Sequence, residues 1–267
     1  MKIAIIGAGN MGGALARGLA SSGKFPEEDI LVSNRSEGKL AALKAQYPGI
    51  FTTTVNQEAV QNADVIVLAV EPPQVPQVME GIVVCEGQIF VSIVAGLSFS
   101  SIHQMLGNDS VRVFKVIPNT AMTVYESMTL ICGQNASPEE TATVESIFSP
   151  LGKTMEISEE KMAAATALSS CGIAYALKFI DAGITAGVHM GIGPKDSAKL
   201  VAQAMAGAAK IILEGDTPPA EEVLKVCTPG GLTIKGVKAL EDGGFPAAII
   251  NAMIAASGKQ YNYLLDI

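Results

Sequence analysis

The chain has 267 residues, of which 49% are hydrophobic and 16% charged, and its formal net charge is −8. A chain of this length and composition is globular and can bury a substantial core. Lysine and arginine form no cluster in this acidic chain, which excludes nucleic acid as a partner. No uncharged apolar run reaches the ~18–20 residues that span a membrane, and no secretory signal pattern is present. We therefore expect a cytoplasmic protein with no membrane partner.

The first 157 residues alternate between predicted strands and helices. Strands are predicted at Lys2–Ile6, Ile30–Ser33, Val65–Val70, Ile89–Ile93 and Val111–Val116, helices at Asn10–Ser22, Lys39–Gln46, Val75–Val84 and Ser100–Leu106, and a last helix–strand unit at Pro138–Ile157. This alternation predicts an α/β fold in which a doubly wound, Rossmann-like parallel sheet carries helices on both faces. Residues 1–157 are thus expected to form a dinucleotide-binding domain.

Residues 158–267 have a different character. Ser158 can cap a helix, with Glu159 and Glu160 in the first turn. The sequence that follows is rich in alanine and shows helical rather than strand patterning. Its apolar faces are broader than one small domain can cover. We therefore predict an all-helical domain over residues 158–267 through which the chain forms a homodimer.

The sequence Gly7-Ala8-Gly9-Asn10-Met11-Gly12 is a G-x-G-x-x-G motif between a predicted strand and a predicted helix. That context is the one a dinucleotide site requires. Gly7 permits the tight turn, Gly9 lets the backbone approach the pyrophosphate, and Gly12 lets helix and strand pack closely. The pyrophosphate is expected to meet the N–H groups that begin the helix, at Asn10 and Met11.

The end of the second predicted strand bears on the choice between NAD and NADP. An NAD enzyme carries Asp or Glu there, whereas this chain has Ser33-Asn34-Arg35, and Asp29 lies at the opposite end of the strand. A guanidinium with small polar neighbours suits a 2′-phosphate. We therefore favour NADP(H) as the cofactor, with NAD(H) as the alternative.

The other strand ends are expected to face the nicotinamide. They offer small residues, a proline and one amide, which could pack closely on a flat ring: Ala69, Val70, Pro72, Ala95 and Asn119. None of these is an evident acid, base or nucleophile. The two histidines are also not expected to be catalytic, because His103 falls on a polar helix face and His189 precedes a helix end. The four cysteines lie far apart and contain no CxxC, so we expect free thiols and no metal site.

A second glycine-containing loop, Thr228-Pro229-Gly230-Gly231-Leu232-Thr233, lies between helical stretches near the C-terminus. Its glycines expose backbone N–H groups and a helix begins directly after it, which is an arrangement that can hold a carboxylate. The Thr233 hydroxyl adds an uncharged donor and acceptor. The same pattern also fits a capped turn between two helices.

These motifs together resemble the pyrroline-5-carboxylate reductase family, over nearly the whole chain. The similarity is carried by the following segments: Ile6–Gly12, Ser33–Arg35, Ala69–Pro72, Pro118–Thr120, Thr166–Ser169, Thr228–Thr233 and Leu240–Glu241. The C-terminal segments are the specific ones, since many reductases share the N-terminal glycines.

The resemblance implies hydride transfer from NAD(P)H to a cyclic imine, which reduces 1-pyrroline-5-carboxylate to L-proline. It also implies a helical dimerisation domain, and dimers of this family often assemble into larger rings. By position, the loop would bind the substrate carboxylate through Thr228, Gly230, Gly231, Leu232 and Thr233. The Thr233 hydroxyl would bond the ring nitrogen as the catalytic contact, and Thr166 and Ser169 would lie near cofactor and substrate.

Two departures from the family bear on substrate choice. Glu71 stands where the family usually has lysine, and Cys171 and Ile173 replace a serine and a proline. Two alternatives stay open, one that shares the fold class and one to which Glu71 and Cys171 give weight. One is a 3-hydroxyacid dehydrogenase of the 6-phosphogluconate dehydrogenase type, although Lys178 and Lys199 do not lie in that family's motif. The other is an NADP-binding regulator without turnover.

Overall fold

The structure is a computed structural model that describes residues 1–258. Its internal contacts divide the chain into one unit formed by Met1–Ser170 and another formed by Cys171–Ala256. The change from strand to helix lies between β8 (Gly152–Glu156) and α7 (Glu159–Ser169). The predicted boundary at residue 158 coincides with this change, whereas the division by contacts falls after α7. The reason is that α7 buries Met162 in the core beneath the sheet.

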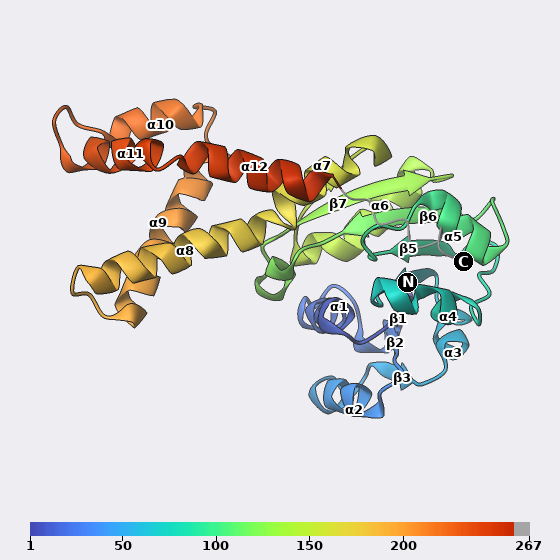
Figure 1. Ribbon diagram of the computed structural model, residues 1–267. Coiled ribbons are helices and arrows are strands. Elements are labelled where there is room, and N and C mark those ends of the chain that lie inside the picture. Colours follow the sequence, from blue (N-terminus) through green and yellow to red (C-terminus); the bar gives the residue numbers. More distant parts are fainter. Residues whose placement is uncertain (259–267) are drawn as a thin grey trace. The chain divides into compact units, whose positions relative to one another are not determined.

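An eight-stranded sheet forms the centre of the first unit, in the order β3-β2-β1-β4-β5-β6-β7-β8 (Figure 1). Its other strands are β1 (Ile3–Ile6), β2 (Ile30–Ser33), β3 (Phe51–Thr53), β4 (Val65–Leu68), β5 (Ile89–Ser92), β6 (Arg112–Ile117) and β7 (Ser127–Gln134). Strands β1 to β6 are all parallel, which confirms the predicted Rossmann-like sheet. The strand order reverses between β1 and β4, the kind of position where such sheets bind ligands.

The sheet is mostly rather than wholly parallel, because β7 runs antiparallel to β6. The connection from Ile117 to Ser127 holds only a short 3-10 helix, η3 (Thr120–Val124). A parallel crossover needs roughly a dozen residues or more, usually including a full helix, so this short connection returns the chain as a neighbouring antiparallel strand. Tyr125 makes the turn in the left-handed region, with φ of 63°.

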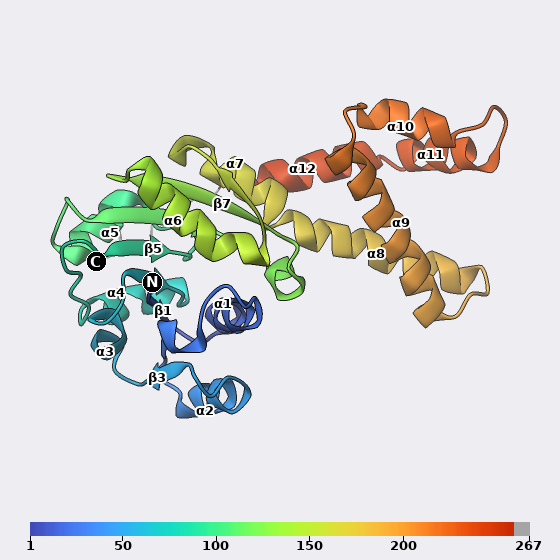
Figure 2. The same ribbon diagram turned by 180° about the vertical axis from the view of Figure 1, so that it is seen from behind.

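Helices cover both faces of the sheet, as predicted (Figure 2). One face packs against α1 (Asn10–Ser21), α2 (Glu37–Gln46) and α6 (Pro138–Phe148), and the other against α3 (Asn56–Val60), α4 (Val75–Met79), α5 (Phe99–Leu106) and α7. Side chains of a strand alternate between the two cores because successive Cβ atoms point to opposite faces. Ile3 and Ile5 therefore belong to one core, and Ala4 and Ile6 to the other.

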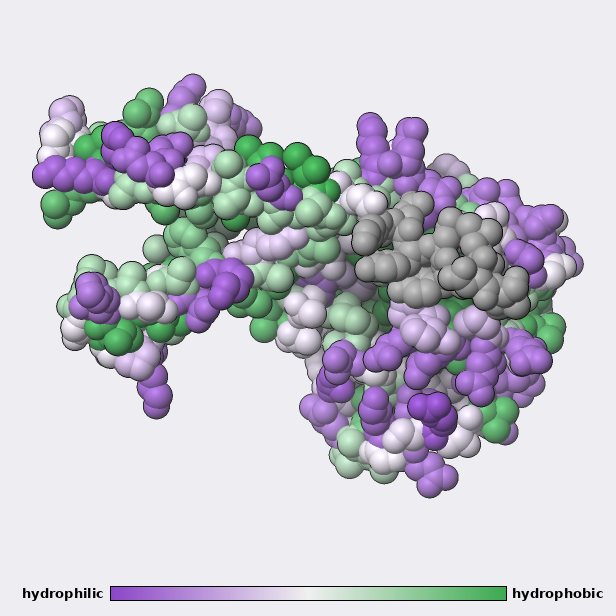
Figure 3. All heavy atoms as spheres, viewed as in Figure 1, coloured by the Kyte–Doolittle hydropathy of each residue, from purple (hydrophilic) through white to green (hydrophobic). Residues whose placement is uncertain are grey.

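The described part of the second unit is helical, which confirms the prediction for this half. It consists of α8 (Gly172–His189), α9 (Pro194–Glu214), α10 (Pro219–Val226), α11 (Leu232–Asp242) and α12 (Phe245–Ser257). Only Gly187 and Ser197 are buried in these helices, at the contact between α8 and α9. Figure 3 shows apolar residues along the surface of this unit. A single chain therefore gives these helices almost no core of their own.

One helical stretch, Glu159–His189, is long and apolar enough to cross a membrane by length and composition alone. The sequence contains no uncharged run of that length, but this criterion admits two charged residues. Only 6% of its most apolar window is buried within the chain. Length and composition give weak evidence for a membrane span, and an apolar helix face covered by another subunit meets the same criterion.

Candidate active site

The loop from β1 to α1 can be formed only with glycine at its first position. Gly7 has φ of +106°, and its N–H donates to the carbonyl oxygen of Ser33 at 2.8 Å. A Cβ on Gly7 would lie 2.5 Å from the carbonyl oxygen of Ala69, at the end of β4. Both the backbone angle and this close approach exclude a side chain. The turn is thereby fixed at the point where β1, β2 and β4 end.

The other two glycines of the motif have different surroundings. A Cβ on Gly12 would overlap the carbonyl oxygen of Gly7 and lie 2.9 Å from the Cβ of Ala69, so helix and strand pack as closely as expected. A Cβ on Gly9 would meet no protein atom within 4 Å. Gly9 is the N-cap of α1 and has no side chain to bond the N–H groups of the first turn, where Asn10 and Met11 lie. This cradle fits an anionic pyrophosphate.

The two ends of the Asn34 side chain are both occupied by the protein. Its Oδ1 accepts the N–H of Ala8 at 3.0 Å, and its Nδ2 donates to the carbonyl oxygen of Ser36 at 3.1 Å. Asn34 thus joins the glycine loop to the end of β2. Arg35 is exposed and forms no ion pair within the described residues. Of the Asn34 and Arg35 side chains, the guanidinium is the one free to meet a phosphate.

Ser33 is predicted to belong to the cofactor site. In the structure it is fully buried, and its hydroxyl donates to Oδ1 of Asn56 at 2.8 Å. The reason is that every residue of β2 is covered, since helices or neighbouring strands pack on both faces. Ser33 therefore supports the strand end from within.

Asn56 is a candidate that the sequence interpretation missed. Its Oδ1 is held by Ser33, whereas its Nδ2 makes no hydrogen bond within residues 1–258. It is half-buried at the start of α3, three residues after the end of β3, the strand that pairs with β2. The only signal in the sequence is a polar residue following β3, and a strand of three residues is too short to show a pattern.

The ends of β4, β5 and β6 carry the residues expected near the nicotinamide. Ala69 is buried, Val70 and Pro72 are half-buried, and Ala95 is exposed. Asn119 is buried, and its Oδ1 accepts the N–H of Ala121 at 3.0 Å. The Asn119 Nδ2 makes no hydrogen bond within the described part of the chain and is left as a donor for a ligand.

Two hydroxyl groups of α7 donate their hydrogen bonds within the helix, so toward a ligand they can only accept. Thr166 donates from Oγ1 to the carbonyl oxygen of Met162 at 2.7 Å, and Ser169 donates from Oγ to that of Ala165 at 2.8 Å. Such bonds to the preceding helical turn use the single hydroxyl hydrogen and leave the oxygen lone pairs free. Thr166 and Ser169 can therefore accept a hydrogen bond from a ligand N–H.

The loop of the second unit has the turn expected from its glycines. Gly230 has φ of +72°, and the N–H of Gly231 donates to the carbonyl oxygen of Thr228 at 3.0 Å. Gly231 is the N-cap of α11 and provides no side-chain cap. Thr233 lies in the first turn, is exposed, and its hydroxyl makes no hydrogen bond within the described residues. The alternative role of Thr233 as a helix cap finds no support in this geometry, and the exposed first turn of α11, beginning at Leu232, fits a carboxylate.

The residues that depart from the family pattern are exposed or half-buried. Glu71 is exposed beside Pro72, and Cys171 and Ile173 are half-buried at the start of α8. Of the other thiols, Cys132 on β7 is buried. Burial raises the pKa of the Cys132 thiol, and the carboxylate of Glu159 raises it further. A thiol in this environment stays protonated and unreactive.

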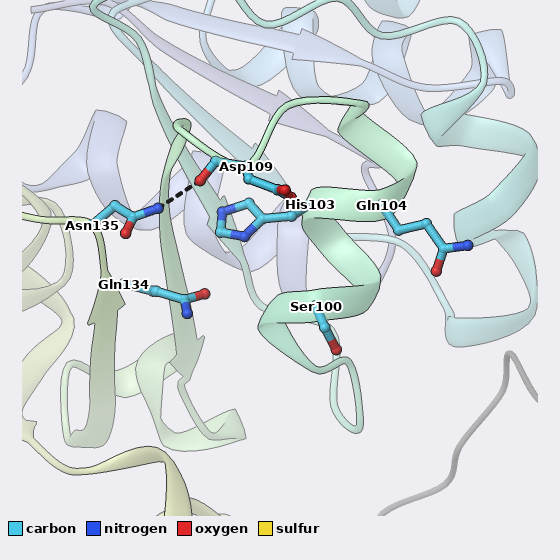
Figure 4. A pocket seen from close by; sticks show the side chains of 6 residues that line it. All are labelled: Ser100, His103, Gln104, Asp109, Gln134 and Asn135. Atoms are coloured by element: carbon cyan, nitrogen blue, oxygen red, sulfur yellow. Dashed lines mark hydrogen bonds between the residues drawn. The ribbon is translucent and has the colours of Figure 1, made fainter.

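A hollow of about 530 Å³ lies near the start of β6, at the end of the strands opposite to the one that carries the glycine loop (Figure 4). It is lined by Ser100, His103, Gln104, Asp109, Gln134 and Asn135. His103 corrects an expectation, because it is buried and not on a polar surface, and its Nε2 lies 3.1 Å from the carbonyl oxygen of Val111. A carbonyl oxygen can only accept, so Nε2 carries the proton. This hollow is remote from the glycine loop and contributes nothing to the dinucleotide cradle.

Comparison with known proteins gives consistent results over the whole chain. Residues 159–262 match the family described as pyrroline-5-carboxylate reductase dimerisation, and residues 2–96 match NADP oxidoreductase, coenzyme F420-dependent. The chain is 34% identical to pyrroline-5-carboxylate reductase 2 of Dictyostelium discoideum, over 97% of this chain and 91% of that protein. It is 37% identical to pyrroline-5-carboxylate reductase of Methanosarcina acetivorans, over 97% and 96%.

A solved structure shows the same similarity in three dimensions. The pyrroline carboxylate reductase of Plasmodium falciparum, crystallised with NADP bound, superposes with a TM-score of 0.88 at 30% identity, covering 97% of both chains. The similarity therefore includes the dinucleotide-binding half and the helical half together.

Proposed function

The chain belongs to the pyrroline-5-carboxylate reductase family, and we propose that it reduces 1-pyrroline-5-carboxylate to L-proline with NADPH. It is an NAD(P)H-dependent oxidoreductase with an N-terminal dinucleotide-binding domain and a helical dimerisation domain. The observation that carries the proposal is the similarity at 34–37% identity over 97% of the chain, which includes both the glycine cradle and the Thr228–Thr233 loop.

The proposed roles of the chain's own residues are to bind the substrate and to orient it. The bound cofactor supplies the hydride. The first-turn N–H groups of α11 would hold the substrate carboxylate, and the Thr233 hydroxyl would accept the ring N–H of the protonated imine. Because a protonated imine is already electrophilic, the side chains proposed to touch it can all be neutral. Holding it at close-attack distance can contribute up to roughly 7–11 kcal/mol to lowering the barrier.

The preference for NADPH rests on the end of β2. Arg35 is exposed and unpaired within the described residues, and Ser33 at the end of β2 is followed by Asn34 and Arg35, not by the Asp or Glu that accepts from a ribose 2′-hydroxyl. Asn34 is occupied by Ala8 and Ser36, so Arg35 would supply the charge for the 2′-phosphate. Asn56 Nδ2 is the second donor at this corner of the sheet.

The helical half supports a homodimer. Large apolar side chains such as Leu177, Leu200 and Leu213 are 59%, 60% and 80% exposed in the single chain. At roughly 25 cal/mol per Å² of apolar surface, leaving this area in water would be strongly unfavourable, so a second copy is expected to cover it. Sedimentation at micromolar concentration tests this, and a folded, active monomer would refute it. Assembly of the dimers into larger rings stays a prediction.

Turnover of pyrroline-5-carboxylate by the purified protein tests the function. Consumption of NADPH should match formation of proline, with no consumption when substrate is omitted. Tight NADPH binding without turnover would overturn the proposal in favour of a regulator. Oxidation of a 3-hydroxyacid in place of imine reduction would overturn it in favour of the dehydrogenase alternative.

A further inference from the structure

An ion pair between a buried ammonium and a carboxylate that is 44% exposed connects the sheet to the helix that carries two of the proposed site residues. Nζ of Lys115, on β6, lies 2.9 Å from Oε1 of Glu159, in the first turn of α7. The Lys115 side chain is 8% exposed, whereas the basic partners of the other ion pairs in the described residues are at least 26% exposed. The ammonium also lies 5.3 Å from the centre of the Phe99 ring.

The position of Lys115 is unusual for a charge. Its neighbours on the same side of β6, Val113 and Ile117, both belong to the core that α7 covers. Removing an ammonium from water is costly, and an apolar side chain of similar volume would often serve stability equally well. A buried ammonium needs a partner, so Lys115 is satisfied where α7 brings the Glu159 carboxylate to it.

Glu159 lies on the same stripe of α7 as the proposed site residues. Met162, Thr166 and Ser169 follow it at intervals of three, seven and ten residues, which places all four on one face of the helix. Met162 is buried in the core on this face of the sheet. The ion pair thus holds one end of the stripe, and the two hydroxyl groups occupy the other end.

Lys115 lies on the strand that leads to another predicted site residue, Asn119. Beyond Ile117, β6 continues directly to Asn119, whose Nδ2 is left for a ligand. Sliding α7 along the sheet by one residue would move Thr166 and Ser169 by about 1.5 Å relative to Asn119. Binding constellations tolerate roughly 0.5 Å.

We propose that Lys115 and Glu159 are positioning residues that set the height and rotation of α7 against the sheet, and so place the Thr166 and Ser169 oxygens for imine reduction. The inference rests on the proposed function for its kinetic consequence. Neither residue is among those proposed to bind the substrate or the cofactor.

The test compares Lys115→Met with a matched control, Arg112→Met. Arg112 also lies on β6 and forms an ion pair, with Glu140 of α6, but α6 packs on the other face of the sheet and carries no proposed site residue. Lys115→Met should lower kcat by about ten- to a hundredfold, because a misplacement near 1 Å can cost that much. The KM for NADPH should stay unchanged, and Lys115→Arg should restore most of the turnover.

Other outcomes overturn the inference. One is a Lys115→Met protein whose kcat per folded molecule equals that of the unmodified protein. The other is an Arg112→Met protein that loses as much kcat as Lys115→Met. If Lys115→Met does not fold, Glu159→Asp keeps both charges and shortens the link by one methylene, and it should still lower kcat with NADPH binding intact. An unchanged kcat in that variant also counts against positioning.

Amide hydrogen exchange in residues 159–169 separates this inference from the proposed function. Exchange there should be faster in Lys115→Met than in Arg112→Met when the two are compared at equal global stability. If the unmodified protein shows no turnover but this difference appears, the function fails while the placement of α7 by Lys115 stands. If exchange is the same in both variants, the positioning role is wrong whatever the activity.

Discussion

Replacing Thr233 with alanine distinguishes a catalytic contact from a structural one. The residue lies in the first turn of α11, its hydroxyl makes no hydrogen bond within the described residues, and the N-cap is Gly231. Loss of the hydroxyl should therefore not reduce stability, and alanine's better helix propensity could raise it by up to ~0.7 kcal/mol. A hydrogen bond to a charged imine contributes ~1.5–3 kcal/mol. At ~1.4 kcal/mol per factor of ten, turnover should fall about ten- to a hundredfold.

The assay measures steady-state turnover and melting temperature on the same preparations, with Thr233→Ser and Thr233→Val as controls. Serine keeps the hydroxyl and should retain most of the activity, whereas valine keeps the shape and should behave like alanine. NADPH binding should be the same in all four proteins. A helix cap predicts the reverse, a loss of ~0.5–2 kcal/mol of stability with normal turnover. Such a destabilised but fully active Thr233→Ala protein would refute the reasoning.

Three further predictions concern the first unit. Arg35→Ala should raise the KM for NADPH far more than that for NADH, and equal changes in both would remove the argument for a 2′-phosphate contact. Gly12→Ala places a Cβ against the Gly7 carbonyl oxygen, so it should abolish NADPH binding, measured by fluorescence titration, or prevent folding; normal binding would contradict the packing. Burial raises the pKa of Cys132, so at neutral pH a thiol reagent should modify the exposed Cys85 first and reach Cys132 only on unfolding. Rapid labelling of Cys132 in the folded protein would show the core to be more open than described.

The pKa of Cys132 also gives the sign of a small pH effect on stability. Because the folded thiol holds its proton more tightly than the unfolded one, this residue favours the folded state less as the pH rises above the ordinary thiol pKa. Stability should therefore fall on the alkaline side more steeply in the unmodified protein than in a Cys132→Ala variant. Equal slopes of melting temperature against pH would show that the thiol does not couple to folding.

The sequence by itself determined most of the local elements and the two glycine loops, although β3, α3 and β7 were not predicted. Continuous β-branched runs such as Val65–Leu68 form buried strands wherever helices cover both faces, so their pattern is sufficient. The positions of Gly7 and Gly12 were also decided locally, because a positive φ and a close helix–strand approach each require a missing Cβ. The apolar helical faces of the second half likewise indicate a subunit partner through their composition and spacing alone.

Only the tertiary structure decided which side chains are available. Ser33, Asn34 and His103 are ordinary polar residues in the sequence, yet each is occupied by a partner at least eight positions away: Asn56, Ala8 and Val111. The direction of β7 and the pairing of Lys115 with Glu159 across 44 residues depend in the same way on how the chain returns to itself. Local patterns predict backbone conformation because a helix or strand is formed by residues that are adjacent in the sequence. These particular hydrogen-bond partners are fixed by distances between remote segments, which no local pattern contains.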